Sequence, residues 1–324
     1  MNNYPFYPLV TIVIPVYKGS NYVQEAIESA LKQTYKNIEI LVINDGSDDN
    51  DKTKNAVEPF LDRVKYIEKK NGGVSSVLNL AFQVMNGEWM SWLSHDDLYY
   101  PEKIARQIEF LSKEKLSSND KVVVVTNYDF IDEKGKLIHP PFKNKLRDNM
   151  SNLELILNNI KRNYFSGITF LIPKKSYYTI GKFDEELKTI SDYDYWYRML
   201  FADFRFLYID EILASNRMHS NQVTYKKSDL AKRESIEFHK RVFRGFLTDN
   251  NLNNKKNLLK LAFFIDVRGV KCVPNLIYNH ITELDKSLLT QIYIIFKVIF
   301  AKIKYSFRFF LKYLYTKLFI LRKK

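Results

Sequence analysis

The feature that most constrains the fold is a pair of apolar strands with an amphipathic helix between them, within residues 9–43. Residues 9–16 and 38–43 are apolar at almost every position and rich in β-branched side chains. Runs of this kind are typical of strands that are covered on both faces. Between them, apolar residues recur at the spacing of a helix with one buried face: Val23, Ala26, Ile27, Ala30 and Leu31. A strand, a helix and a strand in this order predict a βαβ unit and a parallel sheet.

Further strand candidates follow, and several of them end in polar turns. The second strand runs into Asn44-Asp45-Gly46-Ser47, a short third strand at 64–67 precedes Asn71-Gly72-Gly73, and the apolar run 89–93 ends in Ser94-His95-Asp96-Asp97. The carboxyl ends of parallel strands open onto one edge of a sheet, where ligands collect. We therefore expect these turns to form one rim.

The two adjacent carboxylates of Asp96 and Asp97 allow two interpretations. A carboxylate pair at the end of a buried strand is well placed to hold a divalent cation. Alternatively, one of them caps the helix predicted to start near Pro101, since Asp is common at helix starts and Pro suits the first turn. The strand alone does not decide between them.

The chain divides at about residue 225. Before it, strands are predicted at 204–209 and 212–217, and a helix is predicted to begin at Ser191-Asp192. We expect residues 1–225 to form one α/β domain with a mostly parallel, Rossmann-like sheet flanked by helices, and residues 226–324 to form a helical region. A single cysteine, Cys272, excludes an internal disulfide framework and a Cys-based metal cluster, and suits a reducing compartment.

The last 39 residues differ in charge from the rest. Beyond Asp285 there are ten basic residues and no acidic one, against a net charge of +13 for the whole chain. The segment at about 286–324 predicts a basic amphipathic helix that lies in the interface of an anionic membrane. The alternatives are a helix packed on the body of the protein, or one that pairs with a second copy in a homodimer. Without this segment the charge is only slightly positive, so nucleic acid is not an expected partner.

No apolar run reaches the roughly 20 residues that cross a bilayer, and residues 1–8 do not resemble a signal peptide. These observations predict a cytoplasmic protein, associated peripherally with the inner face of the membrane.

Five motifs in this order and spacing resemble those of the family 2 glycosyltransferases with the GT-A fold, over about residues 8–222. They are Pro15-Val16-Tyr17, Asn44-Asp45-Gly46-Ser47-Asp48, Asn71-Gly72-Gly73, Leu93-Ser94-His95-Asp96-Asp97, and Gly181-Lys182-Phe183-Asp184-Glu185-Glu186-Leu187 with the Ser191-Asp192-Tyr193-Asp194-Tyr195-Trp196 run that follows it. Each motif alone is weak, whereas the ordered set is specific.

The resemblance implies roles for particular residues. Asp45 would contact the uracil or ribose of a sugar nucleotide, Asp96 would bind Mn or Mg between the phosphates, and Asp192 would be the catalytic base. The sequence departs from the family at Ser94, where the usual Asp-x-Asp has its first carboxylate. The remaining nucleotide-sugar-binding positions implied are Pro15, Tyr17, Ser47, Asn71, Gly72, Ser94 and His95.

Two of the implied roles have plain structural alternatives. His219 is similar to a His that in some relatives joins the metal or the pyrophosphate, and it could equally be a simple surface His. Asp192 could cap the helix that begins near it, unless its neighbour Ser191 does so.

The predicted function is that of an inverting, metal-dependent glycosyltransferase. It would move one sugar from a nucleotide diphosphate donor, expected to be a UDP-sugar, to a membrane-associated glycan or lipid-linked acceptor in surface polysaccharide biosynthesis. The Gln-x-x-Arg-Trp run of processive synthases is absent from the sequence. Two alternatives stay open: a sugar nucleotidyltransferase, although Tyr17-Lys18-Gly19-Ser20 matches it poorly, and a catalytically silent membrane scaffold or glycan-binding subunit with this fold, which the replacement at Ser94 keeps open.

Overall fold

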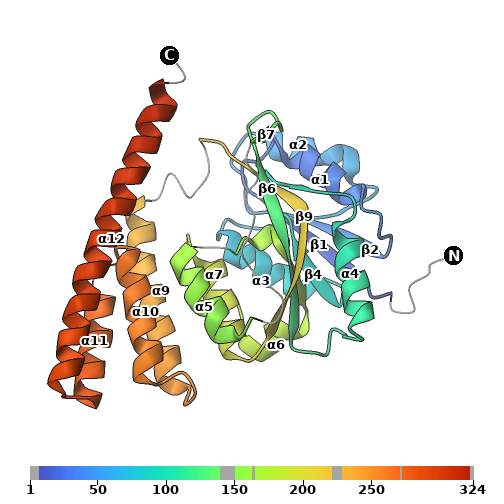
Figure 1. Ribbon diagram of the computed structural model, residues 1–324. Coiled ribbons are helices and arrows are strands. Elements are labelled where there is room, and N and C mark those ends of the chain that lie inside the picture. Colours follow the sequence, from blue (N-terminus) through green and yellow to red (C-terminus); the bar gives the residue numbers. More distant parts are fainter. Residues whose placement is uncertain (1–6, 139–149, 163–164, 221–227, 271, 322–324) are drawn as a thin grey trace. The chain divides into compact units, whose positions relative to one another are not determined.

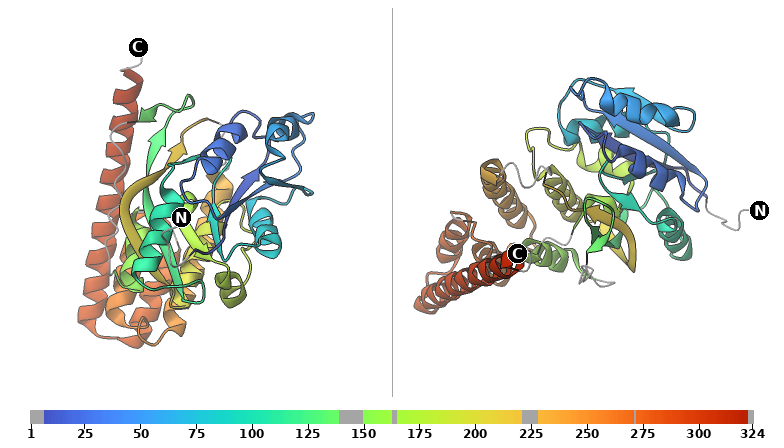
Figure 2. Two further views of the ribbon diagram at one scale, coloured as in Figure 1. Left: turned by 90° about the vertical axis from the view of Figure 1, so that its right-hand side faces the viewer. Right: turned by 90° about the horizontal axis from the view of Figure 1, so that it is seen from above.

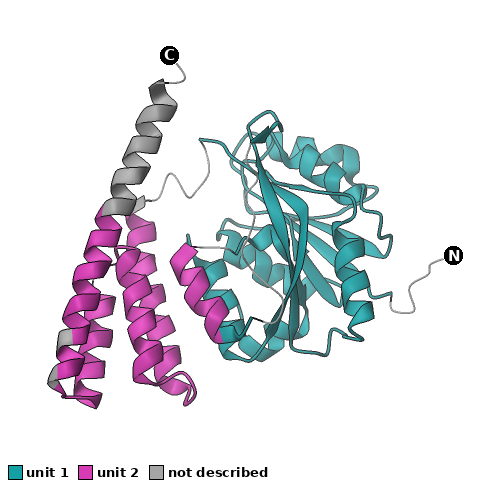
Figure 3. Ribbon diagram, viewed as in Figure 1, with its two compact units in different colours: residues 1–152, 164–227 teal, residues 153–163, 228–324 magenta. Residues whose placement is uncertain are grey.

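The computed structural model describes residues 7–138, 150–162, 165–220, 228–270 and 272–321 (Figure 1). They divide into two compact units (Figure 3): residues 1–152 with 164–227, and residues 153–163 with 228–324. The segment 153–163, predicted to belong to the first domain, groups with the second unit.

A parallel arrangement of four strands forms one half of the sheet in unit 1. These strands are β1 (Val10–Val16), β2 (Ile38–Asn44), β3 (Lys65–Glu68) and β4 (Trp89–Trp92), in the spatial order β3-β2-β1-β4. Val13 of β1 lies opposite Leu41 of β2 on one side and Trp92 of β4 on the other. All seven residues of β1 are buried, as expected of a central strand covered on both faces.

The other half of the sheet contains antiparallel pairs. Next to β4 lies β8 (Phe170–Pro173), followed by β6 (Val122–Ile131), β9 (Arg205–Arg217) and β5 (Leu98–Tyr99), while β7 (Leu137–Ile138) pairs with β6. The strand β8 is antiparallel to both of its neighbours, whereas β6 and β9 run parallel. The two strands predicted at 204–209 and 212–217 are one strand, β9, because an irregularity opposite Thr126 and Asn127 bends it without ending it.

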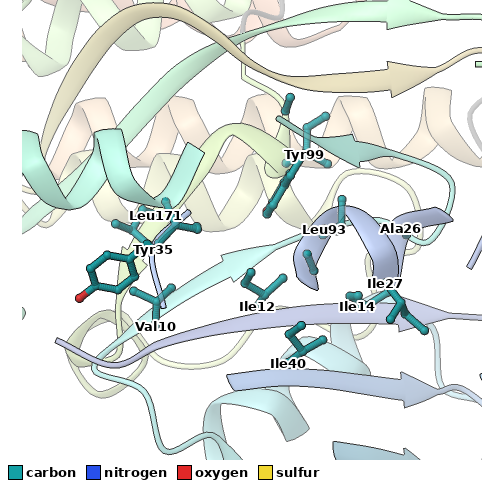
Figure 4. Close-up of a cluster of buried hydrophobic side chains, with 14 of the residues drawn as sticks. Val10, Ile12, Ile14, Ala26, Ile27, Tyr35, Ile40, Leu93, Tyr99 and Leu171 are labelled. Atoms are coloured by element: carbon teal, nitrogen blue, oxygen red, sulfur yellow. The ribbon is translucent and has the colours of Figure 1, made fainter. Parts of the chain in front are cut away.

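Helices cover the sheet of unit 1. They are α1 (Val23–Leu31), α2 (Lys52–Val57), α3 (Val74–Val84), α4 (Lys103–Lys113), α6 (Lys175–Ile180) and α7 (Ser191–Phe201), with single 3-10 turns at Glu58–Phe60 and Gly167–Thr169. The helices α1 and α4 share one hydrophobic cluster with β1, part of which Figure 4 shows around Ile12 and Ile14. A second cluster is aromatic: Phe183 stacks on Tyr195 and Phe170 stacks on Trp196, with ring centroids 3.9 and 4.1 Å apart.

Unit 2 is helical in its described residues. It contains α5 (Asn152–Arg162, with its first residue assigned to unit 1), α9 (Ser228–Thr248), α10 (Lys255–Val267), α11 (Val273–Leu284) and α12 (Leu288–Leu321). The helix α10 contacts both α11 and α12 (Figure 2). Among the described residues, no helix combines the length and the apolarity that crossing a membrane requires.

The segment predicted at about 286–324 forms α12 from Leu288 onward. Its residues 322–324, and its side chains from position 307 on, lie outside the described residues.

Candidate active site

The turns after β2 and β3 meet at the predicted rim, and the carboxylate of Asp45 joins them. Its Oδ1 accepts hydrogen bonds from the Gly72 amide (3.0 Å) and from Lys69 Nζ (2.8 Å), and its Oδ2 accepts one from the Gly73 amide (2.7 Å). The Asn71 side chain donates to the Asp45 carbonyl (2.9 Å). The structure thus brings Asp45, Asn71 and Gly72 together, as the strand-end argument predicted.

Gly46 allows the turn after β2 to lie close to the turn after β3. Gly46 has a φ of +64°, and a Cβ on it would lie 2.7 Å from the Asn71 backbone nitrogen. A larger residue at 46 would separate the two turns.

The turn after β1 lies against the turn after β2. The Lys18 amide donates to Ser47 Oγ (2.8 Å), and the Ser47 amide donates to Asn44 Oδ1 (3.0 Å). Pro15 lies within β1, paired with Ile43. Tyr17 leaves 45% of its surface exposed, so its ring offers a flat apolar face at the rim. Such a face suits stacking of a nucleobase.

Beyond β4, the side chains of Asp96 and His219 converge. His219 Nε2 lies 2.9 Å from Asp96 Oδ2, and the two side chains are 10% and 15% exposed. His219 follows the end of β9, so residues 123 positions apart in the chain meet here. A carboxylate oxygen and an imidazole nitrogen on one partly exposed point are a donor set that Mn²⁺ accepts.

The neighbouring carboxylate, Asp97, has a different environment. It is buried, and its Oδ1 accepts a hydrogen bond from the Arg217 amide (2.8 Å). The hydroxyl of Ser94 also hydrogen-bonds to it. Burial, together with the charge of Asp96, raises the pKa of Asp97 well above its usual range. Of the two adjacent carboxylates, Asp97 ties β9 to the turn after β4 and Asp96 faces His219.

Sequence reasoning missed Arg217, whose fully buried guanidinium holds this region together. Its Nη2 donates to Glu25 Oε2 of α1 (2.7 Å), and its Nε donates to the backbone carbonyl of Asp96 (2.8 Å). Its Cζ lies 4.5 Å from the ring centroid of Tyr22, whose ring is in turn 5.3 Å from that of His219. The guanidinium therefore contacts the Asp96 backbone directly, and Tyr22 links it to His219. The one local signal was a basic residue near the end of a strand, two positions before His219.

His95 is a packed residue in this structure. It donates a hydrogen bond to the Pro15 carbonyl, and burial lowers its pKa. A Cβ on Gly19 would overlap the His95 ring, so the turn after β1 fits closely over the imidazole. His95 therefore packs against the turn after β1 and stabilises it.

Asp192 lies in the first turn of α7, and no charged side chain among the described residues shifts its pKa. Burial raises its pKa to about 6, and the amides of Tyr193 and of Asp192 itself offset part of that effect. The residue preceding α7 is Ile190, and no side chain caps the helix there. Neither Ser191 nor Asp192 is the N-cap residue, but the Asp192 carboxylate accepts hydrogen bonds from two amides of the first turn, so a structural role at the helix start stands beside a pKa of about 6.

The described residues contain no group of three or more His, Cys, Asp or Glu side chains that could hold a metal. Asp96 and His219 would supply two ligands to a bound cation. Two protein ligands fit a cation such as Mg²⁺ or Mn²⁺ that is completed by substrate phosphates and water, because Mg²⁺ in nucleotide sites is bound in this way.

Known proteins resemble this chain in sequence. The model of the family described as Glycosyl transferase family 2 matches residues 11–183. An uncharacterized glycosyltransferase of Rickettsia felis is 44% identical over 226 residues, which are 68% of this chain and 36% of that protein. The chain thus spans about a third of the length of this relative.

Solved structures are similar in fold. Staphylococcus aureus TarS 1–349 in complex with UDP-GlcNAc has a TM-score of 0.64 at 18% identity, covering 90% of this chain and 79% of that one. The mannosyltransferase PcManGT of Pyrobaculum calidifontis, in complex with GDP-Man and Mn²⁺, has a TM-score of 0.56 at 12% identity, covering 93% and 88%. These likenesses confirm the predicted GT-A type of fold with a helical C-terminal region.

Proposed function

The chain belongs to glycosyl transferase family 2, and on that premise we propose that it moves a single sugar from a nucleoside diphosphate donor to a membrane-associated glycan acceptor, with inversion at the anomeric carbon. The observation that carries the proposal is the convergence of Asp96 and His219 at the rim, 2.9 Å apart. Such a pair would hold a divalent cation that binds the diphosphate of the donor.

The rim holds the nucleotide in this proposal. A carboxylate offers about four acceptor positions, and Asp45 uses three of them on the Gly72 and Gly73 amides and Lys69. One position remains for a ribose hydroxyl or a uracil N–H, while the exposed ring of Tyr17 supplies a stacking face. A uracil nucleotide is our choice because the similar TarS structure contains UDP-GlcNAc.

Asp96 and His219 would hold Mn²⁺ or Mg²⁺ at the diphosphate. When bound, the cation neutralises the charge that builds on the departing nucleoside diphosphate. The chain's own contribution is orientation. Arg217 holds the Asp96 backbone, and the Tyr22 ring packs between the Arg217 guanidinium and the His219 imidazole. Residues that orient ligands in this way contribute strongly to metal affinity.

Asp192 would be the base. With a pKa of about 6 it is ionised at neutral pH and still basic enough to accept a proton. It takes the proton of the acceptor hydroxyl as that oxygen bonds to C1 of the sugar, while the bond from C1 to the diphosphate oxygen breaks with its electron pair. The diphosphate leaves as an anion, so no acid is needed to protonate it.

The silent-scaffold alternative rested on Ser94. In the structure its hydroxyl binds Asp97, a residue that supports β9, and Asp96 keeps its own contact with His219. The replacement therefore leaves the cation ligands together, which favours turnover over a purely structural role.

Calorimetric titration with UDP tests the donor and the cation together. We expect wild type to bind UDP with Mn²⁺ present and to lose most of the affinity with excess chelator. Asp96→Ala should bind weakly in both conditions, whereas Asp48→Ala, which removes an exposed carboxylate in the turn after β2, should behave as wild type.

Three outcomes would contradict the proposal. Equal UDP affinity with and without metal would show that no cation takes part in donor binding. No UDP binding in either condition would show that the donor is not a uracil nucleotide. Loss of binding in Asp48→Ala as well would show that any charge change at the rim suffices.

A further inference from the structure

A groove in unit 2 lies between α10 and α12, and it has no part in the site described above. It encloses about 970 Å³ and is lined from α10 by Lys255, Lys256 and Lys260 and from α12 by Tyr293 and Lys297. The two helices lie side by side within this unit (Figure 2). Four lysines therefore border a single concave surface.

Most of this positive charge has no carboxylate beside it. Lys255 pairs with Asp285 at 2.5 Å, but no ion pair within 4.0 Å joins Lys256, Lys260 or Lys297 to an acidic residue among the described residues. A solvated lysine needs no partner, but three on one groove repel each other and attract an anion.

Aromatic rings lie beside Lys297, one of the groove lysines. Lys297 Nζ lies 5.0 Å from the ring centroid of Phe263 and 5.3 Å from that of Tyr293. Lys304 lies 5.9 Å from the same Phe263 ring, which stacks on Phe300. The floor of the groove is therefore apolar and its border is cationic, which is the combination that a membrane interface favours.

An exposed apolar face continues along α12 from the groove. Leu289, Phe296 and Ile303 are 79%, 69% and 61% exposed. The contiguous apolar residues of α12 would stay in water if the groove held only a small soluble anion. A bilayer covers both the apolar face and the charges, because headgroup phosphates lie directly above the acyl boundary.

We propose that the groove between α10 and α12 binds the headgroup phosphates of an anionic phospholipid bilayer, with Lys256, Lys260 and Lys297 as phosphate ligands and the exposed side chains of α12 in the acyl boundary. This deepens the proposed function and rests on its membrane-associated acceptor. It adds α10 to a contact that the sequence had suggested for the C-terminal helix alone.

Sedimentation of the full chain with vesicles tests the groove. We compare phosphatidylcholine vesicles with vesicles that also contain about 30% phosphatidylglycerol, since anionic lipid supplies the attraction. Lys256→Gln with Lys260→Gln should weaken binding to the anionic vesicles about thirtyfold, at roughly 1 kcal/mol for each lysine near the surface. The matched control removes two exposed lysines of unit 1, Lys32→Gln with Lys113→Gln, and should change binding less than about twofold.

Phe296→Ser is a second variant that leaves the lysines in place. It should weaken binding to anionic vesicles in a way that added salt does not change, because the lost contact is apolar. Both groove variants should bind UDP as wild type does, and their thermal unfolding midpoints show whether they are folded.

Several results would overturn the inference. Equal binding to both kinds of vesicle would show that the chain does not recognise anionic headgroups. An unchanged vesicle affinity of the lysine double variant would show that the groove lysines do not bind the membrane. A wild-type chain that ignores vesicles but dimerises in light scattering, with the dimer lost in Phe296→Ser, would assign the surface to a second copy. Failure of the vesicle experiment with intact metal-dependent UDP binding would leave the donor site standing and remove the membrane contact alone.

Discussion

Replacing Asp192 with Asn should stabilise the protein while it abolishes sugar transfer. Burial raises the pKa of this carboxyl from 3.8 to about 6, so folding disfavours its charged form. In the unfolded chain the group ionises normally. This rise in pKa means that the ionised carboxylate lowers the free energy of unfolding by roughly 3 kcal/mol at neutral pH. An amide of the same shape carries no charge and avoids this penalty.

The sign of the effect sets its pH window. Between pH 3.8 and 6 the folded state binds more protons than the unfolded state at this position, so the penalty on wild type shrinks as the pH falls. The advantage of Asp192→Asn should therefore be about 3 kcal/mol at pH 7.5 and roughly half of that at pH 5. An advantage that did not depend on pH would have another origin.

Scanning calorimetry at several pH values measures this difference. The chain has two units, so the transition of unit 1 is identified by its upward shift when UDP and Mn²⁺ are added. Asp194→Asn is the matched control, because Asp194 pairs with Arg198 at 2.9 Å and its loss should lower stability at pH 7.5. If Asp192→Asn lowers the transition temperature at pH 7.5, or transfers sugar at the wild-type rate, the assignment of a buried catalytic base is refuted.

Three further predictions concern other groups. The kcat/KM of wild type should fall about tenfold per pH unit below pH 6, as Asp192 becomes protonated; a flat profile down to pH 5 would exclude it as the base. Arg217→Lys should weaken Mn²⁺ binding in the presence of UDP by about tenfold or more, because a lysine cannot contact Glu25 and the Asp96 carbonyl together. An unchanged Mn²⁺ affinity in the folded variant would show that these two contacts of Arg217 are not needed for cation binding. Lys103→Met should gain stability relative to wild type as the pH falls from about 10 to 7. Burial lowers the pKa of Lys103, so in this range the unfolded wild type binds more protons than the folded protein and loses stability as the pH falls. Urea unfolding at both pH values measures the difference, and a gain that grows toward high pH would contradict the reasoning.

The part of the site that could be predicted follows from parallel strands ending at one edge. Asp45, Asn71 and Gly72 belong to turns after neighbouring strands, so their meeting needs only the βαβ pattern and the rule for strand ends. The pairing of Asp96 with His219 needed the family resemblance as well. No local pattern connects two residues 123 positions apart.

Other features depend on contacts that leave no local trace. The strand β8 enters the sheet between β4 and β6 in the antiparallel direction, which its short apolar run does not reveal. The residue pattern alone also could not distinguish Asp96 from Asp97; the family resemblance chose Asp96, and the hydrogen bond from the Arg217 amide gives Asp97 its structural role. The guanidinium of Arg217 contacts Glu25, 192 residues earlier, and a single basic residue near a strand end does not predict that.

The reach of Arg217 along the chain orders the assembly of the site in time. During synthesis at about 5 to 20 residues per second, the 192 residues from Glu25 to Arg217 take roughly 10 to 40 seconds to appear. The turns that carry Asp45 and Asn71 are complete long before that. The residues proposed to hold the nucleotide are therefore synthesised early, but Asp96 and His219, the proposed cation ligands, cannot meet until β9 has been synthesised. A chain stalled before residue 217 would contain Asp45 and Asn71 but would lack Arg217 and His219, and with them the proposed cation site.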